Sequence, residues 1–265
     1  MTAESSTEAA VADKPATRGA LTQLVPVPPP PLICPSGPPV RGFDTGSYKV
    51  VAFTFDDGPW PVYTDGVMDA FDARGVKATF FMIGNNVRAN PSIARDVVNR
   101  GFEVGNHSAT HSYSPSTIVA EIPRANAIIR EVTGAEPRLF RSPGLATSTR
   151  IDSAMQTYGM CNLFTTYDLG DSKTPRASAS TLCSRFANSL HPGMIVLLHD
   201  GGSHRNTVDA VPCMLDVAIS RGYTIVPAGH LGAYGTGYTG LRPRLTSVEV
   251  EEIEEIDQLP IATTE

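Results

Sequence analysis

The sequence predicts an α/β fold, a distorted (β/α) barrel of seven to eight parallel strands. Short apolar runs, typical of buried strands, alternate with amphipathic helical patterns. Glycines recur every 25 to 34 residues, and each stands shortly before an apolar run. A unit of about 30 residues with one strand and one helix is a βα repeat. About seven such units favour a parallel barrel, and an open doubly wound sheet is the structural alternative.

Seven apolar runs are the expected strands. They span residues 50–55, 78–83, 102–105, 139–141, 162–167, 194–198 and 223–226. Residues 67–71 and 93–98 place apolar side chains on one face of a helix. Residues 118–132 are also helical in pattern but contain Pro123, so we expect a helix that begins near this proline or a kink there.

The two ends of the chain differ from its middle. Eight of the 22 prolines fall between Pro26 and Pro39, so we expect residues 1–46 to be a disordered, proline-rich segment. Residues 249–257 hold six acids and no base, and we interpret residues 233–265 as an acidic tail. The folded domain is therefore expected over residues 47–232.

The charge and hydropathy of the chain exclude several classes of partner. Without the acidic run the chain is nearly neutral, so no nucleic-acid partner is expected. No run approaches the roughly 18 apolar residues that span a bilayer. The first 20 residues lack the basic and apolar regions of a secretion signal. The oligomeric state stays open.

Four cysteines show no C-x-x-C spacing, so a zinc–cysteine site is not expected. They are Cys34, Cys161, Cys183 and Cys213. Cys183 and Cys213 lie in helical patterns, and we interpret them as buried free thiols.

Ionisable residues stand at the carboxyl ends of the expected strands, where βα barrels form their active sites. They are Asp56, Asp57, His107, Arg141, Asp168, Asp171 and His199. His107 and His111 are four residues apart, so a helical turn or a tight loop can bring both imidazoles to one ion. A pair of surface histidines is the alternative for this spacing alone. With one carboxylate they form a facial metal-binding set that leaves positions open for water and substrate.

Two further strand-end residues suit catalysis. His199 suits a proton donor, because the ordinary pKa of histidine lies near 6.5. Arg141, in a buried strand, needs an anionic partner, for which Asp56 is available.

Five motifs in order carry a family resemblance. They are TFDDGP at residues 54–59, ATFFMIG at 78–84, GNHSATH at 105–111, FRSPG at 140–144 and LLHD at 197–200. Together they resemble the NodB-homology polysaccharide deacetylases, carbohydrate esterase family 4, over about residues 47–226.

The resemblance implies a role for each matching residue. Asp56 would be the general base, and Asp57, His107 and His111 would hold a divalent metal, most often Zn²⁺, with Co²⁺, Ni²⁺ or Mn²⁺ possible. Arg141 would orient Asp56, and His199 would protonate the departing amine. The backbone N–H of Gly144 would stabilise the oxyanion.

Two departures from the family pattern stand out. The fourth motif usually carries an aspartate followed by tryptophan, whereas residues 166–172 read TYDLGDS. Either Asp168 or Asp171 could therefore support His199. The residue after Pro143 is often tyrosine in the family and is Gly144 here.

The expected function is metal-dependent hydrolysis of N-acetyl groups from amino sugars in a peptidoglycan-type or chitin-type glycan, with release of acetate. An O-acetyl xylan esterase of the same fold and a non-catalytic glycan-binding module are the alternatives. A non-haem iron oxygenase is disfavoured by the βα pattern. This substrate class suggests an extracellular or cell-envelope location, although no signal peptide is visible.

Overall fold

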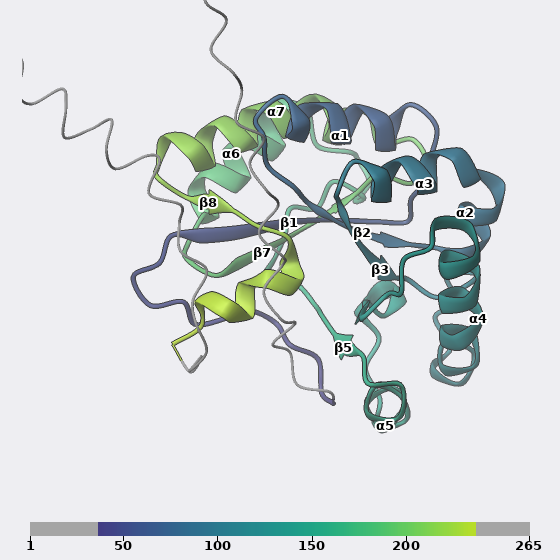
Figure 1. The fold of residues 1–265 in the computed structure, drawn as a ribbon. Helices are drawn as coiled ribbons and strands as arrows, with labels where there is room; N and C mark the ends of the chain where they lie inside the picture. Colours follow the sequence, from purple (N-terminus) through teal and green to yellow (C-terminus); the bar gives the residue numbers. More distant parts are fainter. Residues whose placement is uncertain (1–36, 237–265) are drawn as a thin grey trace, which may run out of the picture.

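The computed structural model describes residues 37–236, which form a curved sheet of parallel strands flanked by helices (Figure 1). The strands within this range are β1 (Val50–Asp56), β2 (Thr79–Met82), β3 (Glu103–Asn106), β4 (Leu139–Phe140), β5 (Cys161–Asn162), β6 (Tyr167–Asp168), β7 (Met194–His199) and β8 (Thr224–Ile225). Their order is β5-β4-β3-β2-β1-β7-β6, and β8 pairs with the start of β1. The prediction of a distorted α/β barrel of seven to eight parallel strands is confirmed.

The expected strand over residues 162–167 is in fact two strands. β5 and β6 stand at opposite ends of the pairing path, and the chain crosses between them. On the way, Phe164 N donates to Val40 O at 2.8 Å and Thr166 N donates to Ile195 O at 3.1 Å. These crossover bonds satisfy backbone groups that a continuous strand would have paired in one ladder.

Helices connect the strands. They are α1 (Tyr63–Asp72), α2 (Gly84–Ala89), α3 (Pro91–Asn99), α4 (Pro115–Thr133), α5 (Thr149–Tyr158), α6 (Ala179–Ser189) and α7 (Arg205–Ser220), with 3-10 helices η1 (Pro143–Leu145) and η2 (Ala228–Tyr234). In Figure 1, α1, α6 and α7 lie side by side over one face of the sheet. α4 begins at Pro115, not near Pro123, which stands inside the helix. Pro115 suits the first turn because its missing N–H would have no intrahelical partner there.

β1 is buried on both faces, which explains its unbroken apolar sequence. Val51, Phe53 and Phe55 join the core between the sheet and the outer helices. The rings of Phe53 and Phe55 contact phenylalanine rings of α1 and α6. Val50 and Ala52 point to the opposite core, which η2 covers. Because side chains alternate along a strand, Thr54 and Asp56 share this second face.

The interpretation of Cys183 and Cys213 as free thiols is wrong. Cys183 of α6 and Cys213 of α7 form a disulfide with a Cα–Cα distance of 6.0 Å, and Cys161 is also disulfide-bonded. The helical patterns of the two segments were identified, but the packing of α6 against α7 brings the two thiols together.

The folded region begins before residue 47. Val40 N donates to Asn162 O at 2.9 Å, and Thr45 is buried. At the other end, η2 runs to Tyr234, and Thr236 N donates to Asp44 O at 2.8 Å. The rest of the predicted proline-rich segment and acidic tail lies outside the described residues.

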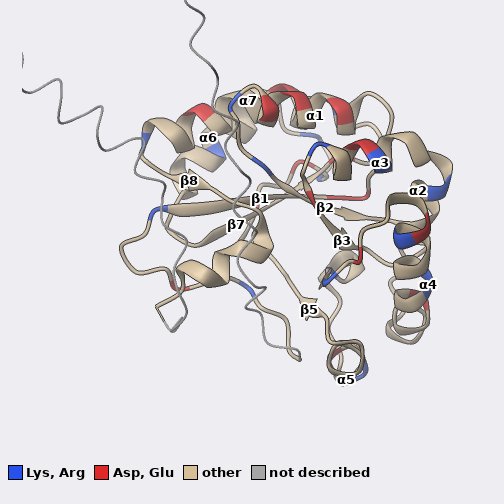
Figure 2. Cartoon of the chain, viewed as in Figure 1, with Lys and Arg blue, Asp and Glu red and all other residues tan. Residues whose placement is uncertain are grey.

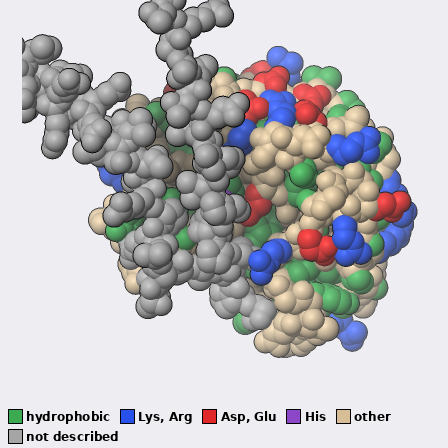
Figure 3. Space-filling model, viewed as in Figure 1, with side chains coloured by type: hydrophobic (Ala, Val, Ile, Leu, Met, Phe, Trp, Pro, Cys, Tyr) green, Lys and Arg blue, Asp and Glu red, His purple; other side chains and the backbone are tan. Residues whose placement is uncertain are grey.

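Charges of both signs are interspersed over the outer helices, and blue and red side chains lie among each other on the uncovered part of the face (Figures 2 and 3). No helix in the described range is long and apolar enough to cross a bilayer.

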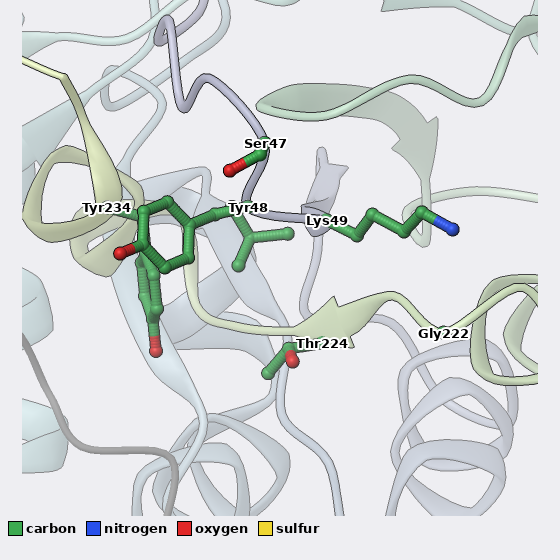
Figure 4. A pocket seen from close by; sticks show the side chains of 7 residues that line it. Ser47, Tyr48, Lys49, Gly222, Thr224 and Tyr234 are labelled. Carbon is green, nitrogen blue, oxygen red and sulfur yellow. The ribbon is translucent and has the colours of Figure 1, made fainter.

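One cavity lies at the amino end of β1, beside β8 (Figure 4). Tyr234, Thr224 and the stem of Lys49 line it. This is the opposite end of β1 from Asp56, so the ionisable strand-end residues do not reach it.

Candidate active site

A second cavity, of about 330 Å³, opens at the carboxyl ends of the strands. Its lining consists of Asp56, Asp57, His107, His111, Tyr113, Gly144, Leu145, Ser172, Leu197 and His199. β1 and β7 are neighbours, and their register places Asp56 opposite His199. Residues that are more than 140 positions apart in sequence therefore face one cavity.

Asp57 turns out of β1 in a strained backbone conformation. Its φ of 75° lies in the left-handed region, which a non-glycine residue rarely adopts. The loop after β7 packs closely on it, because a Cβ on Gly201 would lie 2.4 Å from Asp57 O. The adjacent carboxylates of Asp56 and Asp57 both reach the cavity, where each has an oxygen within 3.7 Å of His107 Nε2.

His107 and His111 lie on a tight loop after β3, one of the two geometries that the spacing allowed. Ser108 N donates to Asn106 Oδ1 at 2.7 Å, and His111 N donates to Ser108 Oγ at 3.0 Å. His111 itself has a φ of 62°. These short-range bonds turn the chain back so that both imidazoles face the same way.

Glu121 of α4 holds this loop from behind, and sequence reasoning missed it. Its Oε2 accepts from Ala109 N at 3.2 Å and Thr110 N at 3.0 Å, and its Oε1 accepts from Thr110 Oγ1 at 2.5 Å. The side chain is buried. The signal in the sequence is an acidic residue among the apolar positions of the helical pattern over residues 118–132.

Asp57, His107 and His111 present three ligand atoms to one point. Asp57 Oδ1 lies 3.4 Å from His107 Nε2 and 3.3 Å from His111 Nε2. Two ligands of a tetrahedral Zn²⁺ stand about 3.3 Å apart, given metal–ligand bonds of about 2.0–2.1 Å. Asp57 Oδ1 is buried and has no hydrogen-bond partner among the described residues. The three residues therefore fit a divalent metal ion.

The tautomer of His107 suits this arrangement. Its Nδ1 lies 2.8 Å from Arg141 O and donates to it, which leaves the Nε2 lone pair facing Asp57. Burial lowers the pKa of His111, so this ring is neutral at pH 7. Burial would raise the pKa of Asp57, but the neighbouring imidazoles, His107 above all, outweigh it and hold that pKa well below its usual range.

Arg141 fixes Asp56 from beneath the cavity. Its buried Nη1 donates to Asp56 Oδ1 and Thr54 Oγ1, both at 2.8 Å. Nε and Nη2 donate to backbone carbonyls of residues 163 and 164. Four hydrogen bonds fix the plane of this buried guanidinium, so the free oxygen of Asp56 is held toward the cavity. That oxygen lies 3.7 Å from His107 Nε2.

Asp171 contacts His199, and Asp168 does not. Asp171 Oδ1 lies 2.8 Å from His199 Nδ1, and Oδ2 accepts from His199 N and Thr207 Oγ1. Asp168 is exposed; it accepts from Gly170 N and pairs with Lys173 at 3.3 Å. All the candidate site residues except Asp168 therefore lie at or directly behind the cavity.

The surroundings of His199 favour its protonated form. Burial would lower its pKa, but the hydrogen bond and charge of Asp171, with the charges of Asp56 and Asp57, raise it to about 9. A protonated imidazole with one N–H bound to Asp171 has its other N–H free for the cavity.

Tyr113 occupies the space next to Gly144, which the sequence had not indicated. A Cβ on Gly144 would lie 2.8 Å from the Tyr113 ring, and Gly144 has a φ of 59°. The ring also stands edge-on to His111, with centroids 5.1 Å apart, and is 67% exposed. Tyr113 thus supplies an aromatic ring at the cavity mouth.

Comparison with known proteins agrees with this geometry. A family model described as polysaccharide deacetylase matches residues 44–163. The peptidoglycan-N-acetylglucosamine deacetylase of Bacillus cereus is 32% identical over 192 residues, which cover 70% of this chain and 89% of that protein.

Two solved structures share the fold. A family 4 acetyl xylan esterase from Clostridium thermocellum, in complex with a cobalt ion, is 34% identical with a TM-score of 0.63, covering 69% of this chain and 90% of that one. A CE4 family pseudoenzyme from Bacillus anthracis is 27% identical with a TM-score of 0.68, covering 75% of this chain and 70% of that one. The matching motifs, the curved parallel sheet and the relatives agree: the chain belongs to the polysaccharide deacetylase family.

Proposed function

We propose that the protein hydrolyses N-acetyl groups of amino sugars in a peptidoglycan-type or chitin-type glycan, with a divalent ion, most often Zn²⁺, as cofactor. The proposal rests chiefly on Asp57 Oδ1, which lies within 3.4 Å of the Nε2 atoms of His107 and His111. The Arg141-bound Asp56 lies beside this group, and His199 stands on the adjacent strand. A bound divalent ion acts as a Lewis acid and lowers the pKa of water from about 15.7 to about 7.

Residues of the protein itself carry out the proton transfers and bind the developing oxyanion. Asp56 accepts a proton from the attacking water, and Arg141 keeps the accepting oxygen in place. The Gly144 N–H donates to the carbonyl oxygen as it gains negative charge. His199 then gives its proton to the sugar nitrogen, the C–N bond breaks, and acetate and a free amine leave. General base and general acid steps each contribute about 10²–10⁴-fold.

The protonation of His199 favours an acetamide substrate over an acetate ester. An amine leaves only when it is protonated, and His199, whose pKa is about 9, carries a proton at neutral pH. Similarity to an acetyl xylan esterase makes O-deacetylation the second candidate. His199→Ala should therefore slow acetate release from N-acetylglucosamine oligomers far more than release from acetyl xylan.

The direct test is acetate release from peptidoglycan, N-acetylglucosamine oligomers and acetyl xylan, before and after chelation and metal restoration. Release that stops with chelator and returns with Zn²⁺ or Co²⁺ supports the proposal. Glycan binding without acetate release at any metal loading would instead identify a non-catalytic module.

Asp56→Asn should lower turnover by about 10²–10⁴-fold while the metal stays bound, because only the proton acceptor is removed. Asp168→Asn is the matched control, since Asp168 lies outside the cavity. Full activity of Asp56→Asn would remove Asp56 from the mechanism.

A further inference from the structure

A second group of metal-ligating side chains stands directly behind His199. Asp171 lies after β6, His199 ends β7 and His204 precedes α7. One ligand atom from each lies within 4.8 Å of the others. The rings of His199 and His204 are stacked, with centroids 5.3 Å apart and planes at 19°. The group shares His199 with the proposed catalytic residues, but Asp171 and His204 do not line the main cavity.

His204 carries a nitrogen without a partner. Its Nδ1 donates to Gly201 O, so in the neutral ring Nε2 is an acceptor. Nε2 is buried and has no hydrogen-bond partner among the described residues, and the whole residue is only 7% exposed. Burial lowers the pKa of His204, so this nitrogen keeps its lone pair at neutral pH. A neutral imidazole nitrogen with a free lone pair is in the form that binds a metal ion.

We propose that Asp171, His199 and His204 form a second, weaker binding site for Zn²⁺, and that its occupation inhibits the enzyme. Two imidazoles and one carboxylate are the same donor set as Asp57, His107 and His111. The affinity is lower because the ion must replace the hydrogen bond between His199 Nδ1 and Asp171 Oδ1, which are 2.8 Å apart. Ligands of a tetrahedral zinc stand about 3.3 Å apart, so these two atoms must separate.

Inhibition follows from the proton balance at His199. Zinc binding to this imidazole releases its acidic proton to solvent, and the nitrogen–zinc bond takes the place of the N–H bond. The ring is then no longer an imidazolium and has no proton of suitable acidity for the leaving group. This part of the inference rests on the proposed function, whereas the binding itself does not.

Binding is tested by calorimetric titration of the metal-free full chain with ZnCl₂. The wild type should bind one more ion per chain than His204→Phe, which keeps a stacked ring but offers no ligand. His191→Phe is the matched control, because His191 is exposed at the opposite end of β7 and should not change the number of ions. Equal stoichiometry of the wild type and His204→Phe would overturn the proposal. If His204→Phe does not fold, as judged by circular dichroism, His204→Asn replaces it with the same expectation.

Inhibition is tested by the ratio of acetate release at excess zinc to release at one equivalent, measured within each variant. The ratio should be about 0.1 or less for the wild type and His191→Phe, a loss of at least about tenfold. It should stay near one for His204→Phe. Equal inhibition of His204→Phe would contradict the assigned ligands. An extra ion in the wild type with no acetate release from any substrate would retain the site and reject the deacetylase function.

Discussion

At the scale of single residues, one buried oxygen organises the proposed metal site. Asp57 Oδ1 is the atom that both histidine nitrogens approach, at 3.3 and 3.4 Å. Asp57→Ala should therefore lose the metal on dialysis, as measured by elemental analysis, while Asp168→Ala should retain it. Unchanged metal content of Asp57→Ala would exclude Asp57 as a ligand.

The pH dependence of kcat/KM is also decided by single residues, because the pair of Asp171 and His199 sets it. Asp171 raises the pKa of His199 to about 9 against the opposing effect of burial. The acid form exists below this pKa, so kcat/KM should fall as the pH rises through it. A bound cation repels the imidazolium, so about 9 is the upper bound for this alkaline limb.

Asp171→Asn removes the negative charge that raises the pKa of His199, whereas the burial that lowers this pKa remains. The alkaline limb should then move toward or below the ordinary histidine pKa near 6.5. A kcat/KM profile against pH measures the shift, with Asp168→Asn as the control. An unmoved limb in Asp171→Asn would show that another group supplies the proton.

At the scale of elements, α4 positions a loop to which it contributes no ligand. Glu121 satisfies two backbone N–H groups and one hydroxyl between His107 and His111. Burial would raise the pKa of Glu121, but the hydrogen bonds that these groups donate hold it below its usual range. The helix thus sets the direction of both imidazoles.

Glu121→Ala leaves these donors without partners and frees the loop. Loss of such an outer partner typically weakens metal affinity by about 10–100-fold. Competition with a fluorescent zinc chelator measures this change, and Glu131→Ala, an exposed site on the same helix, is the control. Glu121→Gln should recover part of the affinity, since its amide oxygen still accepts. An unchanged affinity in Glu121→Ala would make Glu121 irrelevant to the site.

At the scale of the whole molecule, the disulfide between α6 and α7 closes the segment that contains β7. The two cysteines are 30 residues apart, and β7 carries His199 between them. Closing a loop of this length stabilises a protein by about 2–4 kcal/mol, chiefly through the unfolded chain.

Cys183→Ser/Cys213→Ser should therefore lower the free energy of unfolding by about 2–4 kcal/mol. Urea denaturation of the oxidised wild type and of the double variant measures the difference. Equal midpoints with equal slopes would mean that the packing of α6 against α7 suffices without the covalent link.

Much of the fold and site could be predicted from the sequence, because local rules set them. Strand length and apolar content identify β1, β2 and β7, whose residues are buried almost throughout. In a parallel barrel the residue after each strand reaches the same end, so the order of Asp56, His107, Arg141 and His199 predicts a shared cavity. The H-x-x-x-H spacing keeps two imidazoles close in either a helix or a loop.

The remaining features depend on contacts between distant residues, which local patterns do not contain. Asp168 and Asp171 are equivalent in sequence, and only the packing of the β6–α6 connection against β7 places Asp171 on His199. The pairing of Cys183 with Cys213 depends on the packing of α6 on α7. The role of Glu121 depends on the packing of α4 against the loop that carries His107 and His111. The sequence by itself thus determines the strands and the ionisable residues at their ends. Which distant residue each side chain contacts is decided only by the packing of the folded elements.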